Sequence, residues 1–562
     1  MLATLLVWLY TFFLCYVYGC LFLKLLRADL PASPLIVIAG LVVLTTLASF
    51  FSLFFQTGLF INLLLLTGAM GAILTRKIPA PRIGRPAAWI PLIALFLALL
   101  LVLENATHRP LNPDTNIYHA QAIHWIESFP AVPGLGNLHG RLAYNSAWFV
   151  GNALFSLAFL GLGSFHLTAG VLFLSVLLYC WGGLGDILRG EYKPSALIKL
   201  LVFPLTFALL GAEISSPGTD LPASLLLWLV AVLWAEQERP FHPLLIVVLA
   251  AFVVTVKLSA APALLLIPIV LMSKTFTIER TENNREKSGP LGIGAITCRK
   301  SGLIPTYGRL VICAALVLLP FLARNVILSG YLLYPFPSID FFRVDWKVPL
   351  ERVVAERESI LAWGRFPRLG ASRVLAMPLR EWLPKWLAAQ TLNRRLILAA
   401  ALLSPLAALP GLRLARRYWL GWLVFLAGTL FWLFSAPDFR FGYGFLIGTI
   451  LLALAPWLAW LFKRIPVSPA KVSVVISLAM AAYLVFALVT SFEARDFASR
   501  LLLPAGYDRV PTQSCALANG AVFCAKAYDA CSYNAFPCVP SPRPWVELRN
   551  APDLRDGFRA AP

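Results

Sequence analysis

Ionisable side chains recur beside the ends of long apolar segments in this sequence. An ionisable group at such a position is costly unless it has a partner or a function. Acids that share an aqueous cavity with several cations could bind a phosphorylated, lipid-linked substrate, with one carboxylate acting as a general base. The candidates are three acids (Asp114, Asp220 and Asp438), four cations (Arg141, Lys257, Arg324 and Arg440) and three histidines (His119, His124 and His139).

The densest group of these candidates lies in one polar stretch, residues 112–148, which interrupts an otherwise apolar sequence. It contains all three histidines together with Asp114 and Arg141. A loop rich in acids, bases and aromatic side chains is the natural place to look for a functional site.

The elements that must position these residues are predicted to be membrane helices. The chain is 59% hydrophobic and only 13% charged, with a mean hydropathy of +0.77, whereas a soluble domain has about 25% charged residues. The apolar residues form blocks of roughly 17–25, the length of a membrane-spanning helix. We therefore predict an all-α polytopic membrane protein with about fourteen transmembrane helices.

The formal net charge of +20 does not indicate nucleic-acid binding, because no basic ridge interleaved with aromatic residues is present. Most Lys and Arg residues fall in short connections between apolar blocks, where they set orientation and favour anionic membrane lipids. The basic connections at residues 76–85 and 273–302 are predicted to be cytoplasmic. Residues 112–148 and both termini are then extracytoplasmic.

Three regions are expected on this basis. Residues 1–87 form extra N-terminal transmembrane helices, residues 88–490 form the catalytic transmembrane module, and residues 491–562 form an extracytoplasmic tail. The module has outer loops at residues 105–164 and 337–394, which are predicted to carry helices on the membrane surface, including a short segment at 148–160 that is too short to span. The segment 243–272 is predicted to be two crossings with Lys257 at their outer turn.

The tail contains four closely spaced cysteines: Cys515, Cys524, Cys531 and Cys538. In an oxidising compartment such a cluster predicts two disulfides, with three alternative pairings. A four-thiolate zinc site is the alternative interpretation.

These features, in this order, resemble the GT-C superfamily of membrane glycosyltransferases, and in particular its aminoarabinose-transferase and protein-mannosyltransferase members. The resemblance covers about residues 88–450. It rests on Asp114 in NPDTNIYH after a helix exit, the surface segment NALFSLAFLGLGSFH, Asp220 in SSPGTDLP, Lys257 in VTVKLSAAP, the exit from Arg324-Asn325 to Tyr334-Pro335, and the PDFRFGYG turn with Asp438 and Arg440.

The resemblance implies a GT-C-like helix bundle in the bacterial cytoplasmic membrane, with a polyprenyl-phosphate-linked sugar as donor and a lipid or glycan as acceptor. Asp114 would be the catalytic base of an inverting transfer. Lys257, Arg324, Arg440 and Arg141 would bind the phosphate, with Asp220, Asp438 and the three histidines in supporting roles. Many relatives have an acidic pair where this chain has Asp114 followed by Thr115, so a divalent cation cofactor is left open.

Each candidate residue also has a structural explanation. Asp114 and Asp220 could cap helix N-termini, and the histidines could form ordinary surface hydrogen bonds. Lys257 could extend to the membrane interface, and Arg324 and Arg440 could be interfacial anchors.

Two other functions are compatible with the sequence. One is a polysaccharide polymerase or ligase that uses lipid-diphosphate substrates. The other is a flippase or transporter of lipid-linked sugars. Transporters tend to contain internal repeats and charges near the midplane of the membrane. This chain has no evident repeat, and its charges lie at the helix ends, which favours an enzyme.

Overall fold

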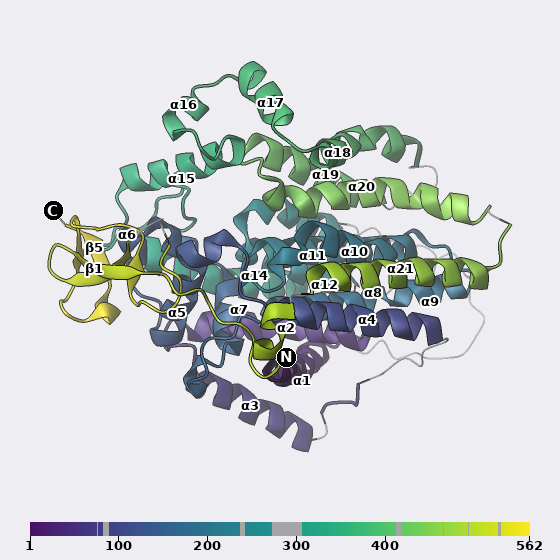
Figure 1. Ribbon diagram of the computed structural model, residues 1–562, viewed down its shortest axis with the longest axis horizontal. Helices are drawn as coiled ribbons and strands as arrows, with labels where there is room; N and C mark the ends of the chain where they lie inside the picture. The colour runs from purple at the N-terminus through teal and green to yellow at the C-terminus, as the bar shows by residue number, and fades with distance from the viewer. Residues whose placement is uncertain are drawn as a thin grey trace, which may run out of the picture.

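The computed structural model describes residues 1–75, 77–81, 89–236, 242–272, 306–411, 418–464, 466–492, 494–526 and 530–561. It shows an elongated bundle of helices with a small β-rich unit at one end (Figure 1). The prediction of an all-α membrane protein is consistent with this architecture, because eight of the described helices are long and apolar enough to cross a bilayer.

The eight long segments are α1 (Leu2–Leu25), α2 (Ser33–Phe51), α8 (Thr168–Cys180) continued by α9 (Gly182–Leu188), α10 (Pro194–Leu210), α14 (Thr306–Ser329), α18 (Leu392–Gly411), α20 (Phe439–Phe462) and α21 (Pro469–Ser491). Shorter helices lie among them: α3 (Leu59–Leu74), α4 (Trp89–Ala106), α7 (Ala147–Phe155), α11 (Asp220–Glu236), α12 (His242–Val256), η5 (Leu258–Leu265) and α19 (Trp419–Phe434).

The centre of the bundle is formed by α11 and α12, whose residues are buried almost throughout their length. A helix that is apolar on all sides is expected in such a position. By contrast, α18 and α21 expose apolar side chains, for example Leu406 and Val489 at 72% each. Exposed apolar faces on long helices are suited to contact with lipid.

Helices α1 and α2 approach each other closely through two glycines. A Cβ atom at Gly40 would lie 1.7 Å from the Cys15 carbonyl oxygen, and one at Gly19 would lie 2.0 Å from that of Ile36. Small residues at helix contacts are typical of membrane proteins.

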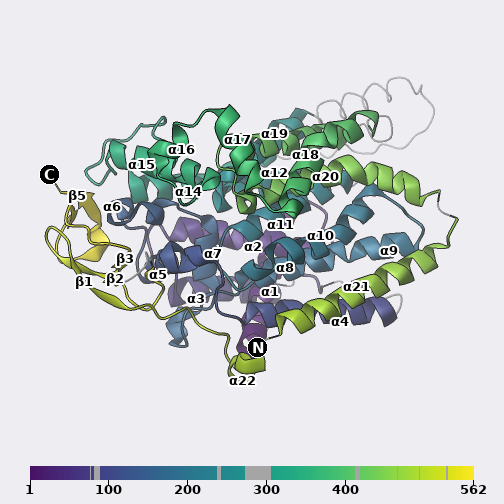
Figure 2. The same cartoon turned by 45° about the horizontal axis from the view of Figure 1, so that its top comes forward.

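The polar elements gather at one end of the bundle, which we call the tail end because the C-terminal strands lie there (Figures 1 and 2). The N-terminus is tied to the start of the tail, since the Leu2 and Ala3 amides donate to Leu501 and Leu502. Helices α5 (Ala120–Ser128), α6 (Leu135–Leu138) and α15 (Leu350–Arg365) lie beside the strands in both views, whereas α22 (Ala494–Arg500) lies beside the N-terminus (Figure 2). The remaining short elements are η1 (Thr115–His119), η2 (Gly140–Ala143), η3 (Ala158–Leu160), η4 (Gly211–Glu213), α16 (Ala371–Leu375) and α17 (Leu379–Ala388).

The tail contains two small sheets. Strands β1 (Thr512–Ala516) and β2 (Ala521–Ala525) are antiparallel, and β3 (Cys538–Val539) pairs with β2 in parallel. Strands β4 (Val546–Leu548) and β5 (Phe558–Ala560) form the second sheet, and η7 (Leu554–Asp556) lies between them. The four tail cysteines form two disulfides, Cys515–Cys524 and Cys531–Cys538, so the disulfide interpretation holds and the zinc alternative is wrong.

Three expectations about the topology have different outcomes: one is wrong, one falls mostly outside the described residues, and one is confirmed. Residues 148–160 were expected to lie on the membrane surface, but α7 is buried on all sides, because it packs between α2, α5 and α12. Most of the basic connections, at residues 76, 82–88 and 273–305, lie outside the described residues. The expected break at Lys257 is present, since α12 ends at Val256 and η5 begins at Leu258.

Candidate functional site

Asp114 lies at the tail end, between α4 and the short π-helix η1. It occupies the N-cap position of η1, but its side chain forms no capping hydrogen bond. Instead the Asp114 amide donates to Asn112 Oδ1 at 2.9 Å. Capping therefore does not explain the Asp114 carboxylate. Single-turn π segments are frequent at functional sites.

Arg440, at the start of α20, joins two carboxylates from distant parts of the chain, Asp114 and Asp220, to that of its near neighbour Asp438. Its Nη1 lies 3.7 Å from Asp114 Oδ2 and 3.9 Å from Asp220 Oδ2, and its Nη2 lies 3.5 Å from Asp438 Oδ2. On the other side of Asp114, Arg141 Nη1 lies 3.8 Å from Oδ1. Lys257 completes this group, which we call the ion cluster: Asp114, Arg141, Asp220, Lys257, Asp438 and Arg440.

Lys257 forms an ion pair with Asp220 and lies 3.9 Å from the centre of the Phe441 ring. Asp220 is the most enclosed member of the cluster, since its side chain is 5% exposed, whereas that of Asp114 is 24% exposed. Burial and a short pair suit Asp220 to a structural role, because a buried carboxylate needs a partner. Neither Lys257 nor Arg440 extends to an interface as an isolated charge.

A small cavity opens beside the ion cluster, between α11, η5 and α20. Its lining combines charged side chains with apolar ones. It is lined by Asp220, Ala223, Ser224, Leu227, Lys257, Ser259, Ala260, Arg440, Phe441, Gly444 and Phe445.

Sequence analysis missed Glu213 and Asn112 as supports of the site. Asn112 Nδ2 donates to Glu213 Oε2 at 2.8 Å, and the Asn112 amide donates to Ser216 Oγ at 3.0 Å. Gly218 lies against this pair, where a Cβ atom would be 3.0 Å from both Asn112 Nδ2 and Glu213 Oε2. The run of polar residues before Asp220, EISSPGT, was the available signal.

Aromatic residues surround Arg141, and sequence analysis gave them no role. The guanidinium lies 5.9 Å from the centre of the Tyr118 ring, and Tyr118 contacts the edge of Tyr144 with ring centres 5.5 Å apart. The Tyr144 hydroxyl in turn hydrogen-bonds to Glu356 of α15. Glu356 sits in an ordinary amphipathic helix, so no sequence signal distinguished it.

The three histidines have different surroundings. His119 is 2% exposed and packs between Tyr118 and Phe149; burial lowers its pKa to about 4, although Asp114 and Asp220 act in the opposite direction. Burial, together with the charges of Arg543 and Arg141, lowers the pKa of His139 to about 3. His124 contacts the tail instead of the ion cluster.

Arg324 is not part of the ion cluster. It is 4% exposed, and it donates from Nε to Asn145 Oδ1 at 3.1 Å and from Nη1 to Ser52 Oγ at 2.7 Å. No carboxylate of the described residues forms an ion pair with it. It borders a second cavity, next to Trp125 and Phe149. Its location corrects the expectation that it lies with Lys257 and Arg440 around one phosphate, and it is no interfacial anchor.

A metal ion has no ready-made site in the described ranges, where no three His, Cys, Asp or Glu side chains are grouped to hold one. The three aspartates of the ion cluster converge on the Arg440 guanidinium instead.

The family comparison covers most of the chain. The family model described as a domain of unknown function, DUF8201, matches residues 1–285 and 291–447. The chain belongs to this family. The DUF8201 match includes every member of the ion cluster. It also continues without a break past residue 87, the expected boundary between the extra N-terminal helices and the catalytic module. No curated protein and no solved structure matches the chain.

Proposed function

We propose that this protein is a glycosyltransferase that moves a sugar from a polyprenyl-phosphate donor to a lipid or glycan acceptor, with inversion, at the outer face of a bacterial cytoplasmic membrane. The residue that acts as base is Asp114. The proposal starts from the resemblance to GT-C enzymes. Its main structural support is the Asp114 carboxylate, which lies between two cations and accepts no hydrogen bond from the described residues.

The Asp114 carboxylate has two cationic neighbours but accepts no hydrogen bond from the described residues. Its two cationic neighbours lie at 3.7 and 3.8 Å, which is longer than a hydrogen bond, and no donor in the described part of the chain hydrogen-bonds to it. The two cations lie beside the carboxylate without hydrogen-bonding to it, so its oxygens stay free to accept the proton of an acceptor hydroxyl. This is the condition that a general base must meet.

The cations of the cluster can stabilise a leaving phosphate. Arg440 has a forked guanidinium group and Lys257 a compact ammonium group. Both line the cavity, together with Leu227, Phe441 and Phe445. Such cations stabilise the charge that develops on a leaving group. A lining that combines cations with apolar side chains is suited to a phosphate on an isoprenoid chain.

The orientation of the protein belongs to the same proposal. About fourteen crossings place the ion cluster, the tail and the N-terminus on the outer side. The bonds between Leu2 and Leu501 and between Ala505 and Thr107 support a common side for these segments. The two disulfides agree with an oxidising compartment.

The test uses the purified full chain in detergent, supplied with polyprenyl-phosphate sugars, and measures the release of free polyprenyl phosphate. Asp114→Asn should lower turnover by about 10²- to 10⁴-fold. The matched control is Asp340→Asn, an exposed outer aspartate whose partner is Lys347, and it should keep normal turnover. Turnover unaffected by Asp114→Asn would remove Asp114 as the base. Turnover only with diphosphate-linked oligosaccharides would identify a polymerase or ligase.

A further inference from the structure

The C-terminal tail forms many hydrogen bonds and ring contacts with the segment that follows Asp114. We infer that the loop closed by Cys531–Cys538 is a clamp that positions Asp114, and that Gln121 is the positioning residue through which the clamp acts. This inference rests on the proposed role of Asp114 for its effect on turnover, whereas the docking itself does not depend on that role.

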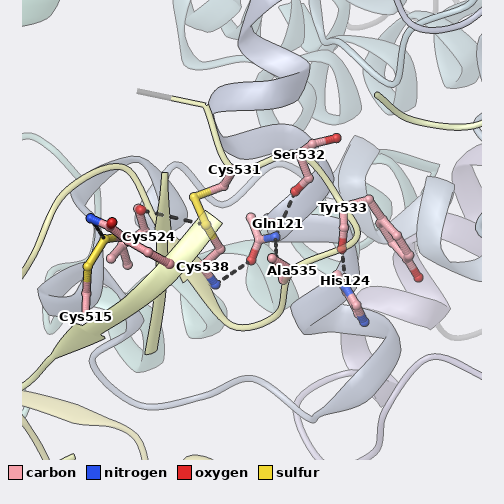
Figure 3. The surroundings of a disulfide bond; sticks show 11 residues. Gln121, His124, Cys515, Cys524, Cys531, Ser532, Tyr533, Ala535 and Cys538 are labelled. Atoms are coloured by element: carbon pink, nitrogen blue, oxygen red, sulfur yellow. Dashed lines mark hydrogen bonds between the residues drawn. A yellow bond between two sulfur atoms is a disulfide. The ribbon is translucent and has the colours of Figure 1, made fainter. Parts of the chain in front are cut away.

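Gln121, in the first turn of α5, directs its whole amide group to the clamp (Figure 3). Its Nε2 donates to the Ser532 carbonyl at 2.7 Å and to the Ala535 carbonyl at 2.8 Å, and its Oε1 accepts from the Cys538 amide at 3.0 Å. Gln121 is 1% exposed. A buried amide with all these bonds satisfied contributes to a specific arrangement, and an unsatisfied one is costly.

The clamp also contacts η1 directly, two residues from Asp114. The Asn116 carbonyl accepts from the amides of Cys531 at 2.7 Å and Ser532 at 2.8 Å. The Asn116 side chain donates to Asp508 Oδ2 at 2.8 Å. The π-helix that begins after Asp114 is thus held by the tail through both backbone and side chain.

Aromatic packing reinforces these hydrogen bonds one turn further along α5. The His124 ring lies between Tyr533 and Phe536, with ring centres 4.2 and 4.0 Å away, and its Nδ1 lies 3.1 Å from the Tyr533 carbonyl oxygen. The Tyr533 hydroxyl donates to Glu127 Oε2 at 2.5 Å. The loop between the two cysteines therefore covers a full face of α5.

The disulfide determines the shape of this loop. Cys531 and Cys538 are separated by seven positions, and every clamp residue that contacts α5 lies between them or is one of them. Both cysteines are almost completely buried, at 1% and 2% exposed. The other bridge, Cys515–Cys524, joins β1 and β2 and does not touch Gln121, so it provides a matched control on the same tail.

Position matters for a general base, because a misplacement of 1 Å can lower a rate by about 100-fold. Asp114 receives no short hydrogen bond that would fix it, only the two cations at 3.7 and 3.8 Å. Its placement then depends on the backbone on both sides of it. Asn112 holds the Asp114 amide on one side, and the clamp holds the backbone of η1 on the other.

The docking arm of the test is hydrogen–deuterium exchange of the intact protein. In Gln121→Met and in the double variant Cys531→Ser/Cys538→Ser, exchange should rise in residues 112–128 and 531–538. The controls are Gln513→Met, an exposed glutamine of β1, and Cys515→Ser/Cys524→Ser. Both should leave exchange at residues 112–128 unchanged. Since β2 pairs with β3, the second control should raise exchange in residues 512–526 and in the paired residues 537–539. Unchanged exchange at 112–128 in both clamp variants would refute the docking.

The activity arm measures kcat and KM with a polyprenyl-phosphate sugar. We expect kcat to fall by roughly 10- to 100-fold in the two clamp variants while the donor KM stays constant, because the phosphate-binding cations do not belong to the clamp. A rise in donor KM with constant kcat, or no change in either, would overturn the positioning role even if exchange increases. Absence of turnover in the unaltered protein would instead refute the proposed function, and the exchange arm would still decide the docking.

Discussion

Arg440 Nη1 lies 3.7 Å from Asp114 Oδ2, and the same nitrogen lies 3.9 Å from Asp220 Oδ2. One guanidinium thus connects a partly exposed carboxylate with a buried one. Since Asp220 has Lys257 as a second partner, the two aspartates share a cation but differ in solvent access. Their substitutions should therefore have different consequences.

Asp220→Asn should mainly destabilise the protein. It leaves Lys257 and Arg440 with less compensation in an enclosed site, and breaking such a buried pair costs about 3–5 kcal/mol. Asp114→Asn should cost no more than about 1 kcal/mol, as for exposed pairs. The midpoint of thermal unfolding in detergent checks this. Equal midpoints for the two variants would contradict the assignment of Asp220 as the structural member.

Substitutions of Arg440 and Arg324 should also have different effects. Arg440→Lys keeps the charge but loses the fork that reaches three carboxylates, so kcat/KM should fall by about 100-fold. Arg324→Lys breaks the bonds to Asn145 and Ser52, so it should lower thermal stability and leave the kinetics of the folded protein unchanged. A selective rise in donor KM in Arg324→Lys would show that Arg324 binds the donor.

Docking of the tail should weaken as the pH falls from about 6.5 to about 4. Burial between Tyr533 and Phe536 lowers the pKa of His124 from 6.5 to about 4. The undocked state therefore binds more protons in this window, and its relative population rises as the pH falls. Above pH 6.5 the docked state has its full stability. Tail-exchange rates at pH 7 and pH 5, corrected for intrinsic exchange, measure the effect.

Two neighbouring groups must be separated from His124 in this experiment. Burial raises the pKa of Glu127, which favours docking at lower pH and so has the opposite sign. His119, at about 4, is buried on the same segment and has the same sign as His124. His124→Phe keeps the ring stack without the titration, so its pH dependence should be weaker than that of the unaltered protein. Identical slopes would exclude His124 as the titrating group.

Orientation can be tested with single cysteines labelled from outside intact cells. Gly506→Cys is suitable because a Cβ atom there meets nothing within 4 Å, and it should react without permeabilisation. Val467, 41% exposed between α20 and α21, should react as Val467→Cys only after permeabilisation. Among the described residues, the native free cysteines Cys15, Cys20, Cys180 and Cys313 are buried. Cys298, which lies outside the described residues, is replaced by Ser in both variants so that it gives no background labelling. The reverse pattern would invert the proposed topology.

Part of the candidate site could be predicted because its charged residues stand out against apolar neighbours in the sequence. Lys257 interrupts a long apolar run, and Asp220 and Asp438 stand directly before helices, so each could be recognised from its immediate neighbours. Their convergence on Arg440 could not be deduced in the same way, because it depends on how distant helices pack.

Gln121 shows why the remainder could not be predicted. It is uncharged, it lies in a short amphipathic helix, and its partners are backbone atoms up to 417 positions away. Backbone carbonyls and amides have no sequence signature. The same reasoning applies to α7, whose length suggested a surface helix but whose burial depends on neighbours from three other elements.

The bond between the first residues and the start of the tail has a consequence for how the protein folds. Leu2 and Ala3 are paired with Leu501 and Leu502, so the start of α1 is held by a segment about 500 positions away in the sequence. Contacts of such large sequence separation form late, because the entropy of closing the chain must be overcome first. Until residues 501–538 are in place, the start of α1 lacks its backbone partners and α5 lacks the loop that covers it. Loss of the tail should therefore loosen both segments, although they lie far from it in the sequence.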